Sequence, residues 1–261
     1  MTPDWIDVAG AVNMRDVAGL PSTDGRTVQP GRLLRSDNLQ DLTPADIGTL
    51  RSRGLTDVID LRRPAESAST GQGPLHQEAW VRIHPLSMFL EEQHRPNTVS
   101  HSVLPPSALP WIEESPESDS SPSSPYLAYL RNRPDSVVAG LQIIGRAPGA
   151  TLVHCAAGKD RTGTLVALAL LLVGVGADAV IADYVATGER IEAVLDRLRA
   201  TATYREILTR PVADYLPGPG LMADFINQVA PAGRTGELTQ FLGRYGWTIA
   251  DAQRLSNKLL G

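Results

Sequence analysis

The segment TLVHCAAGKDRTG, residues 151–163, decides the fold class of this chain. Its apolar start predicts a buried strand over residues 151–155, and a glycine-bearing turn then leads into an apolar helix. Cys155 in this turn is the only cysteine among 261 residues, so it forms no intramolecular disulfide. Because no CxxC or HxxxH spacing accompanies it, we expect neither a metal nor another cofactor.

Strands alternate with helices around this segment. The other short strands are expected at Leu33–Arg35, Asp57–Leu61 and Trp80–Ile83. Thr43, Pro44 and Asp46 form a capping-box pattern that opens a helix between the first two strands, and Pro134 opens a second helix before residue 151. The alternation predicts an α/β fold with a mostly parallel central sheet flanked by helices.

Two regions depart from this alternation. The C-terminal part is predicted to be helical, because apolar residues repeat at helical spacing over residues 191–198 and Thr248 with Asp251 gives another capping pattern. Residues 88–125 are rich in Pro, Ser and acidic residues, which is typical of a disordered surface insertion or of a mobile lid over an active site. The apolar contacts of such a lid would be Met88, Phe89, Leu90, Trp111 and Ile112. We expect residues 1–261 to form a single domain that includes this segment.

The composition is that of an ordinary globular protein and argues against several classes. Hydrophobic residues make up 42% and charged residues 20%, and the net charge of −5 does not support a nucleic-acid binder. The N-terminal residues lack the basic and apolar regions of a secretory signal, and the longest apolar run, Leu165–Val175, is too short for a transmembrane segment. We expect a cytoplasmic protein, while export without a cleaved signal would leave no mark in the sequence.

The turn after the strand at residue 151 predicts an anion-binding loop. Ligands of open α/β sheets bind beyond the carboxyl ends of the strands. Backbone N–H groups of such a turn and the positive end of the next helix attract an anion, including a cysteine thiolate. Arg161 follows Cys155 by six residues, and its planar guanidinium group matches two oxygens of a phosphate. The segment therefore indicates phosphoryl transfer to the sulfur of Cys155.

HCAAGKDRTG resembles the signature loop of cysteine-dependent protein tyrosine phosphatases, and more narrowly that of the bacterial tyrosine and phosphoinositide phosphatases of the mycobacterial B type. Residues 13–19 (NMRDVAG) are similar to the NxRDxxG motif of this group, and GRLLRSDNLQDLTPAD, DVIDLR, DYVAT and TIADAQRLSNKLLG also fit it. The resemblance spans most of the chain and is weakest over residues 88–125. It implies a tyrosine phosphatase-like fold and hydrolysis of phosphate monoesters without metal, on phosphotyrosine, phosphoserine, phosphothreonine or phosphoinositides.

The resemblance also implies a role for each residue of the loop. Cys155 attacks phosphorus, Arg161 clamps two equatorial oxygens, and His154 orients the loop. The residues expected to bind the substrate phosphate are Ala156, Ala157, Gly158, Lys159 and Thr162. Thr162 would also donate its hydroxyl to the sulfur and make it a better leaving group. Lys159 adds a positive charge that suits highly phosphorylated head groups, unless it is an ordinary solvent-facing loop lysine.

The general acid is not supplied by a WPD loop, because the chain has no WPD tripeptide. Asp160 is therefore the candidate acid, although the neighbouring basic residues favour its ionised form. The alternatives are Asp60 or a glutamate of the lid segment, Glu91 or Glu92. The supporting residues are expected to be Asn13, Arg15, Asp16, Asp60 and Arg62. Arg15 and Asp16 would follow a surface turn. Asp16 and Asp60 are either partners in structural salt bridges beneath the loop or catalytic groups, and Arg62 is also a candidate for a substrate contact.

Two alternative functions remain compatible with the sequence. A non-catalytic phosphate-binding module would keep the loop but would not need the nucleophile. A rhodanese-like sulfurtransferase also has a cysteine in a loop after a strand, but it would not need the GKDRTG continuation. For the phosphatase, the expected partner is a phosphorylated protein or a phosphoinositide, with no nucleic acid and no membrane span. The sequence does not indicate an oligomeric state.

Overall fold

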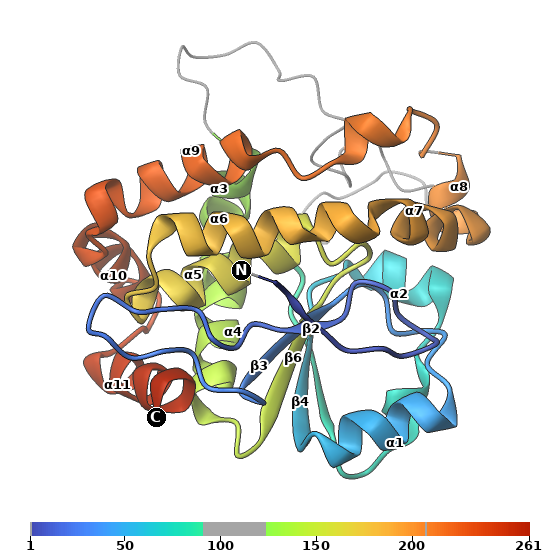
Figure 1. Cartoon of the computed structure of the whole chain (residues 1–261), viewed down its shortest axis with the longest axis horizontal. Coiled ribbons are helices and arrows are strands. Elements are labelled where there is room, and N and C mark those ends of the chain that lie inside the picture. Colours follow the sequence, from blue (N-terminus) through green and yellow to red (C-terminus); the bar gives the residue numbers. More distant parts are fainter. Residues whose placement is uncertain (1, 91–123, 207) are drawn as a thin grey trace, which may run out of the picture.

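The computed structural model describes residues 2–90, 124–206 and 208–261. At its centre lies a six-stranded sheet with the order β1-β2-β3-β6-β4-β5 (Figure 1). The strands are β1 (Asp4–Trp5), β2 (Arg15–Asp16), β3 (Leu33–Ser36), β4 (Leu55–Asp60), β5 (Arg82–Pro85) and β6 (Ala150–His154). The neighbours β3, β6, β4 and β5 run parallel, whereas β1 and β2 pair antiparallel. This confirms the mostly parallel sheet expected from the sequence.

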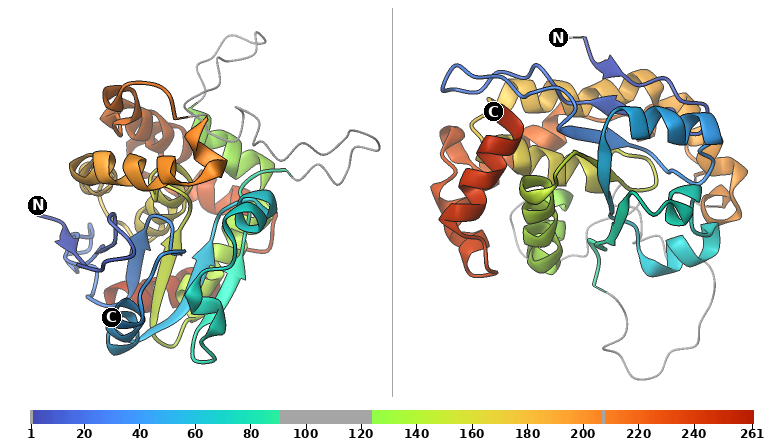
Figure 2. Two further views of the ribbon diagram at one scale, coloured as in Figure 1. Left: turned by 90° about the vertical axis from the view of Figure 1, so that its right-hand side faces the viewer. Right: turned by 90° about the horizontal axis from the view of Figure 1, so that it is seen from below.

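Helices lie against both faces of the sheet (Figure 2). In the first part of the chain they are α1 (Pro44–Ser52), α2 (Pro64–Thr70), η1 (Pro74–Gln77), α3 (Pro125–Asn132) and α4 (Pro134–Arg146). The second part contains α5 (Asp160–Leu172), α6 (Ala177–Ala186), η4 (Thr187–Arg190), α7 (Ile191–Ala200), α8 (Ala202–Arg205), η5 (Val212–Tyr215), α9 (Pro219–Val229), η6 (Pro231–Gly233), α10 (Gly236–Gly243) and α11 (Ile249–Leu260). The predicted helical character of the C-terminal part is thus confirmed.

Local signals in the sequence fixed most helix starts. The capping boxes of Thr43 with Asp46 and of Thr248 with Asp251 are both formed, and α4 begins at Pro134 as predicted. Strand β5 lies two residues later than the predicted Trp80–Ile83. It is a partly exposed strand at the edge of the sheet, so its position follows from pairing with β4 and carries little hydrophobic pattern of its own.

The parallel strands separate two apolar cores, because successive side chains of a strand point to opposite faces of the sheet. The larger core receives Leu33, Ile59 and Val153, and the smaller core receives Leu34, Val58 and Leu152. The larger core also takes in nearly all of α5, which explains why that helix is apolar on most sides. The smaller core is closed by α1 and η1 through Leu50 and Leu75.

Strand register brings three loops to one edge of the sheet. His154 at the end of β6 lies beside Ser36 at the end of β3 and Asp60 at the end of β4. All three strands run in the same direction, so the segments that follow them meet beyond their carboxyl ends. The signature loop after His154 therefore lies between the residues that follow Ser36 and those that follow Asp60.

Asp251 gives a test of how the C-terminal helix is attached. It caps α11 through Thr248 and accepts hydrogen bonds from Gln142 (3.0 Å) and Arg146 (2.7 Å) of α4. We expect Asp251→Ala to lower the free energy of unfolding by roughly 2 kcal/mol, measured by urea unfolding with circular dichroism. As a control, Arg254→Ala removes only a half-exposed partner of the same carboxylate and is expected to change it by less than about 0.5 kcal/mol. Equal losses in the two variants would contradict this account.

Candidate active site

The signature loop joins β6 to α5 and surrounds Cys155, whose side chain is buried. Gly158 adopts a left-handed conformation with φ +67°, and a Cβ atom there would lie 2.4 Å from the Ser36 carbonyl oxygen. Glycine is therefore required twice, for the backbone angle and for the close approach of the loop to β3. Both constraints fix the path of the backbone around Cys155.

Several backbone N–H groups of this loop have no acceptor within the part of the chain that the structure describes. Among the described residues, nothing accepts a hydrogen bond from the N–H groups of Ala156, Ala157, Gly158 or Arg161. These four residues are all buried. Because buried backbone donors are almost always paired in folded proteins, a cluster of unpaired ones is the signature of an anion site.

The carbonyl groups of the same loop are held by residues from other segments. Ala156 O accepts from the Asn38 N–H (3.0 Å), Ala157 O from Asn13 Nδ2 (3.0 Å) and Gly158 O from Arg35 Nη2 (2.8 Å). Since each of these carbonyls is held by the body of the protein, the peptide groups of the loop have fixed orientations, with the four N–H groups named above unpaired among the described residues. Asn13 thus holds the carbonyl group of Ala157 and Arg35 that of Gly158, while the supporting role expected of Asn13 stays a prediction.

Arg15 also supports this clamp. It belongs to β2, is buried, and donates to Asn13 Oδ1 (2.6 Å). Asp183 of α6 pairs with both Arg15 (3.0 Å) and Arg35, so two buried guanidinium groups share one carboxylate. The path from Asp183 through Arg15 to Asn13 fixes the loop carbonyl of Ala157.

Asp16 is not brought to the loop. It also lies buried in β2, where its Oδ2 accepts a hydrogen bond from the Gly31 N–H (2.6 Å). Gly31 precedes β3, so this contact lies at the end of the strand opposite the signature loop. Of the two readings proposed for Asp16, catalytic group or salt bridge beneath the loop, the described contacts support neither.

Arg161 is oriented by a buried ion pair with Glu66 of α2. Its two terminal nitrogens donate to the two carboxylate oxygens, at 2.5 Å (Nη1 to Oε2) and 3.0 Å (Nη2 to Oε1). Burial alone would lower the pKa of Arg161, but the negative charge of Glu66 outweighs it and raises that pKa well above its usual value. Tyr204 of α8 donates to Glu66 Oε1 at 2.6 Å and completes the support. A fixed, charged guanidinium group therefore lies at the start of α5.

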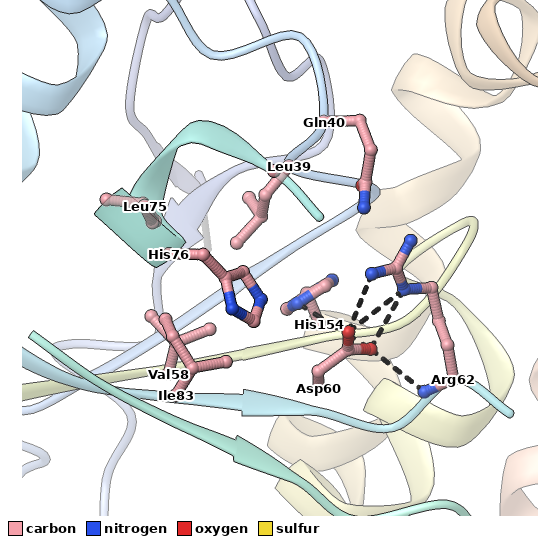
Figure 3. A pocket seen from close by; sticks show the side chains of 10 residues that line it. Leu39, Gln40, Val58, Asp60, Arg62, Leu75, His76, Ile83 and His154 are labelled. Atoms are coloured by element: carbon pink, nitrogen blue, oxygen red, sulfur yellow. Dashed lines mark hydrogen bonds and ion pairs between the residues drawn. The ribbon is translucent and has the colours of Figure 1, made fainter. Parts of the chain in front are cut away.

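His154, Asp60 and Arg62 lie close together in the lining of one small pocket (Figure 3). Arg62 donates to both carboxylate oxygens of Asp60, and His154 Nε2 lies 3.7 Å from Asp60 Oδ1. His154 Nδ1 donates to the Cys155 carbonyl oxygen at 3.2 Å. Asp60 and Arg62 thus form a buried salt bridge at the carboxyl end of β4.

Asp160 and Lys159 are both buried where the loop meets α5. Asp160 Oδ1 accepts a hydrogen bond from the Tyr126 hydroxyl at 2.6 Å. Burial raises the pKa of the Asp160 carboxyl, against the opposing charge of Lys159 and the hydrogen bond from Tyr126. Lys159 is not a solvent-facing loop lysine, because its Nζ donates to the Tyr215 carbonyl oxygen at 2.8 Å. Its charge is held inside the site, 3.9 Å from Asp160 Oδ1.

The Thr162 hydroxyl does not make the hydrogen bond to sulfur that we expected. It is fully buried and has no hydrogen-bond partner within the described part of the chain. Thr162 is the third residue of α5, so the helical backbone determines where its side chain points. The hydroxyl remains a donor next to the loop without an assigned acceptor.

The expected lid falls almost entirely on residues 91–123, which lie outside the described residues together with Trp111 and Ile112. Of its other proposed contacts, Met88 is buried in the larger core and Leu90 is 62% exposed. The Phe89 ring lies 5.4 Å from the guanidinium carbons of both Arg63 and Arg161.

The C-terminal part of the chain also reaches the signature loop, since the region from α7 to η5 packs directly on Ala156 and Ala157.

The sequence analysis did not identify the supporting groups Arg35, Glu66, Tyr126, Asp183 and Tyr204. Glu66 carried a usable signal, because it follows Pro64 at the start of a helix just after the strand end at Asp60. The sequence did not indicate a role for Arg35, because it follows two leucines in a strand that reads as part of the apolar core. Tyr126 and Asp183 come from helices that only tertiary packing brings to the loop.

No helix in the described ranges combines the length and apolarity needed to cross a membrane. Within the same ranges no three His, Cys, Asp or Glu side chains gather as potential metal ligands.

His154 makes the stability of the fold dependent on pH. Burial lowers the pKa of its imidazole to about 4, so the folded protein keeps His154 neutral while the unfolded chain takes up a proton near pH 6.5. Its contribution is complete above pH 6.5 and is lost as the pH falls toward 4, by roughly 3 kcal/mol. We expect urea unfolding from pH 7 to pH 4.5 to show a smaller loss of stability for His154→Asn than for the unmodified protein. An equal loss of unfolding free energy between pH 7 and pH 4.5 in the two proteins would contradict the lowered pKa of His154.

Comparisons with known proteins agree with this geometry. The sequence model of the tyrosine phosphatase family matches residues 6–261. The triple specificity protein phosphatase PtpB of Mycobacterium tuberculosis is 30% identical over 280 residues, covering 98% of this chain and 99% of PtpB. A Cupriavidus necator protein named as a tyrosine-protein phosphatase is 30% identical over 181 residues, covering 68% of this chain and 61% of its own. These matches confirm the resemblance noted in the sequence and favour a phosphatase over a binding module or a sulfurtransferase. The chain belongs to the tyrosine phosphatase family and is a protein tyrosine phosphatase.

Proposed function

We propose that this phosphatase hydrolyses phosphate monoesters through a phosphocysteine formed on Cys155, within a single phosphatase domain of residues 1–261. The observation that carries the proposal is the loop of unpaired, buried N–H groups that surrounds this cysteine. Such a loop stabilises the phosphate in the ground state and the extra negative charge in the transition state. A thiolate at its base is stabilised by the same groups and is the nucleophilic form of cysteine.

The first step transfers the phosphoryl group to sulfur. The Cys155 thiolate attacks phosphorus in line, the bond from phosphorus to the ester oxygen breaks, and the leaving oxygen takes a proton from Asp160. Arg161 binds two of the equatorial oxygens, and Glu66 holds the guanidinium group in the plane that this contact requires. The loop N–H groups bind the third oxygen.

The second step returns the enzyme to its starting state. Water attacks the phosphocysteine, the bond between phosphorus and sulfur breaks, and the carboxylate of Asp160 takes back a proton from that water. The products are inorganic phosphate and the Cys155 thiolate. No redox partner or cofactor enters this balance.

Asp160 is a better candidate for the general acid than Asp60. Both carboxyl groups are buried, but Asp60 accepts hydrogen bonds from Arg62 on both oxygens, which favours its ionised form. Asp160 has one phenolic partner, and burial raises its pKa, so the protonated form that an acid needs is more accessible. Asp160 also lies within the phosphate-binding loop, where the loop enters α5.

We propose phosphotyrosine proteins as substrates, with phosphoserine, phosphothreonine and phosphoinositides as further substrates. PtpB, whose match covers 98% of this chain, is named a triple specificity phosphatase. A second cation inside the site, Lys159, supports a highly charged substrate, because its ammonium group is already desolvated beside the loop. A panel of phosphopeptides and phosphoinositide head groups, compared by kcat/KM, measures this preference directly.

The nucleophile is tested by Cys155→Ser. An alkoxide is much harder to form at neutral pH than a stabilised thiolate, so we expect hydrolysis of nitrophenyl phosphate without added metal to fall by a factor of about 10³ or more. Binding of vanadate should persist, because the loop N–H groups and Arg161 are unchanged. Turnover near the original rate would refute the assignment of Cys155.

The general acid is tested by a series of leaving groups. We expect Asp160→Asn to slow alkyl phosphates by roughly 10²-fold or more and nitrophenyl phosphate much less, because only a poor leaving group needs protonation. It should also weaken the basic limb of the pH–rate profile. Asp60→Asn is the matched control, and we expect it to lower the melting temperature and to slow all substrates by a similar factor. If the dependence of rate on leaving-group pKa is unchanged in Asp160→Asn, another group is the acid.

A further inference from the structure

The two carboxylate oxygens of Asp160 have different surroundings. Oδ1 accepts the Tyr126 hydroxyl at 2.6 Å and lies 3.9 Å from Lys159 Nζ. Oδ2 is buried, and no donor among the described residues reaches it. A buried carboxylate oxygen without a donor is unfavourable, so this asymmetry directs a proton to Oδ2.

Tyr126 is held rigidly where it meets Asp160. It lies on α3 and is 1% exposed. Its ring stacks on Tyr129, with centroids 6.3 Å apart, and meets Tyr184 and Phe225 edge-on at 6.0 Å and 6.2 Å. Because packing on three aromatic rings fixes the tyrosine side chain, the position of its hydroxyl is fixed as well.

A second tyrosine sets the direction of this hydrogen bond. The hydroxyl groups of Tyr126 and Tyr184 lie 2.6 Å apart, and a carboxylate oxygen can only accept. When Asp160 is ionised, Tyr126 therefore donates to Asp160, and Tyr184 of α6 donates to Tyr126. The chain of hydroxyl groups joins α6 through α3 to the first residue of α5.

We propose that Tyr126 is a positioning residue of the reaction, which holds Oδ1 of Asp160 and so leaves Oδ2 as the oxygen that donates the proton to the leaving group. The inference rests on the proposed role of Asp160 as general acid. In the first step the Oδ2 proton moves to the ester oxygen as its bond to phosphorus breaks, and Tyr126 keeps its own proton. In the second step the attacking water returns a proton to Oδ2.

The charges around Asp160 determine the sign of the expected pH effect. The titratable groups that act on it or are affected by it are Lys159 and Arg161 beside it, Tyr126 and Tyr129 of α3, and Tyr184 of α6. Burial keeps the pKa of Tyr126 well above its usual value, so its hydroxyl stays protonated. A hydrogen bond from this hydroxyl favours the carboxylate form of Asp160. Removing it therefore raises the pKa of Asp160.

The test is the pH dependence of kcat/KM for Tyr126→Phe, measured with an alkyl phosphate. The variant keeps the packed ring and removes only the hydroxyl. We expect the basic limb to move to higher pH by about one unit, while the acid limb stays in place. Below the basic limb, turnover of the alkyl phosphate should fall about tenfold more than that of nitrophenyl phosphate, because the acid is less well oriented.

Tyr129→Phe is the matched control. Tyr129 lies on the same helix, is equally buried, and has a hydroxyl without a partner among the described residues. We expect its basic limb to stay within about 0.2 units of that of the unmodified protein. An unshifted basic limb in Tyr126→Phe, or an equal shift in Tyr129→Phe, overturns the inference.

A direct titration separates this inference from the proposed role of Asp160. The carboxyl carbon of Asp160, labelled with carbon-13 and assigned by its loss in Asp160→Asn, reports the pKa of the group without catalysis. We expect that pKa to rise in Tyr126→Phe, and an unchanged value overturns the inference even if Asp160→Asn behaves as the loss of an acid. If the pKa rises while the basic limb stays in place, Asp160 is not the acid, and the positioning role falls with it.

Discussion

The structure depends on one constraint, which is the orientation of the peptide groups in the signature loop. Three carbonyl groups accept hydrogen bonds from Asn13, Arg35 and Asn38. Within the described part of the chain, the N–H groups of Ala156, Ala157, Gly158 and Arg161 are left without acceptors. Unpaired buried donors are unfavourable in the absence of an anion. The parallel strands on either side of β6 supply the rigid frame that maintains this arrangement, and Gly158 permits the close contact with β3.

Buried charges then fix this arrangement from outside the loop. Asp183 forms ion pairs with two arginines, Arg15 and Arg35. Glu66 forms an ion pair with Arg161, and Asp60 forms one with Arg62. A buried ion pair adds little net stability compared with apolar packing, but removal of one partner leaves an unpaired charge and is strongly destabilising. These pairs therefore hold the guanidinium groups in single orientations. Single orientations are what a phosphate site needs, since a small misplacement of a charged donor greatly slows the reaction.

The same burial separates groups that are charged from groups that are neutral. Burial keeps His154 neutral, with a pKa of about 4, although Asp60 lies close to it. Burial also raises the pKa of Asp160, although the nearby positive charge of Lys159 lowers it. Arg161 instead stays charged, because Glu66 is bonded to both of its terminal nitrogens. Which group carries a proton thus follows from the partners that packing provides, and residue type alone does not decide it.

The sequence by itself determined the parts that depend on neighbouring residues. The strand, turn and helix around Cys155, the capping boxes at Thr43 and Thr248, and the alternation of strands and helices follow from local pattern, and the structure agrees with them. The order of the strands in the sheet, with β4 beside β6, then places Asp60 next to His154.

Only the tertiary structure decided which side chains far apart in the chain meet at the loop. The site contains side chains from three different helices: Tyr126, Asp183 and Tyr204. Each lies far along the sequence from its partner, so no local periodicity of the sequence indicates the contact. The structure also placed Lys159 inside the protein and moved Asp16 away from the loop, because burial is a property of the packed chain. Local sequence specifies the backbone of a segment, whereas the partner of a buried charge is chosen by the topology that brings distant segments together.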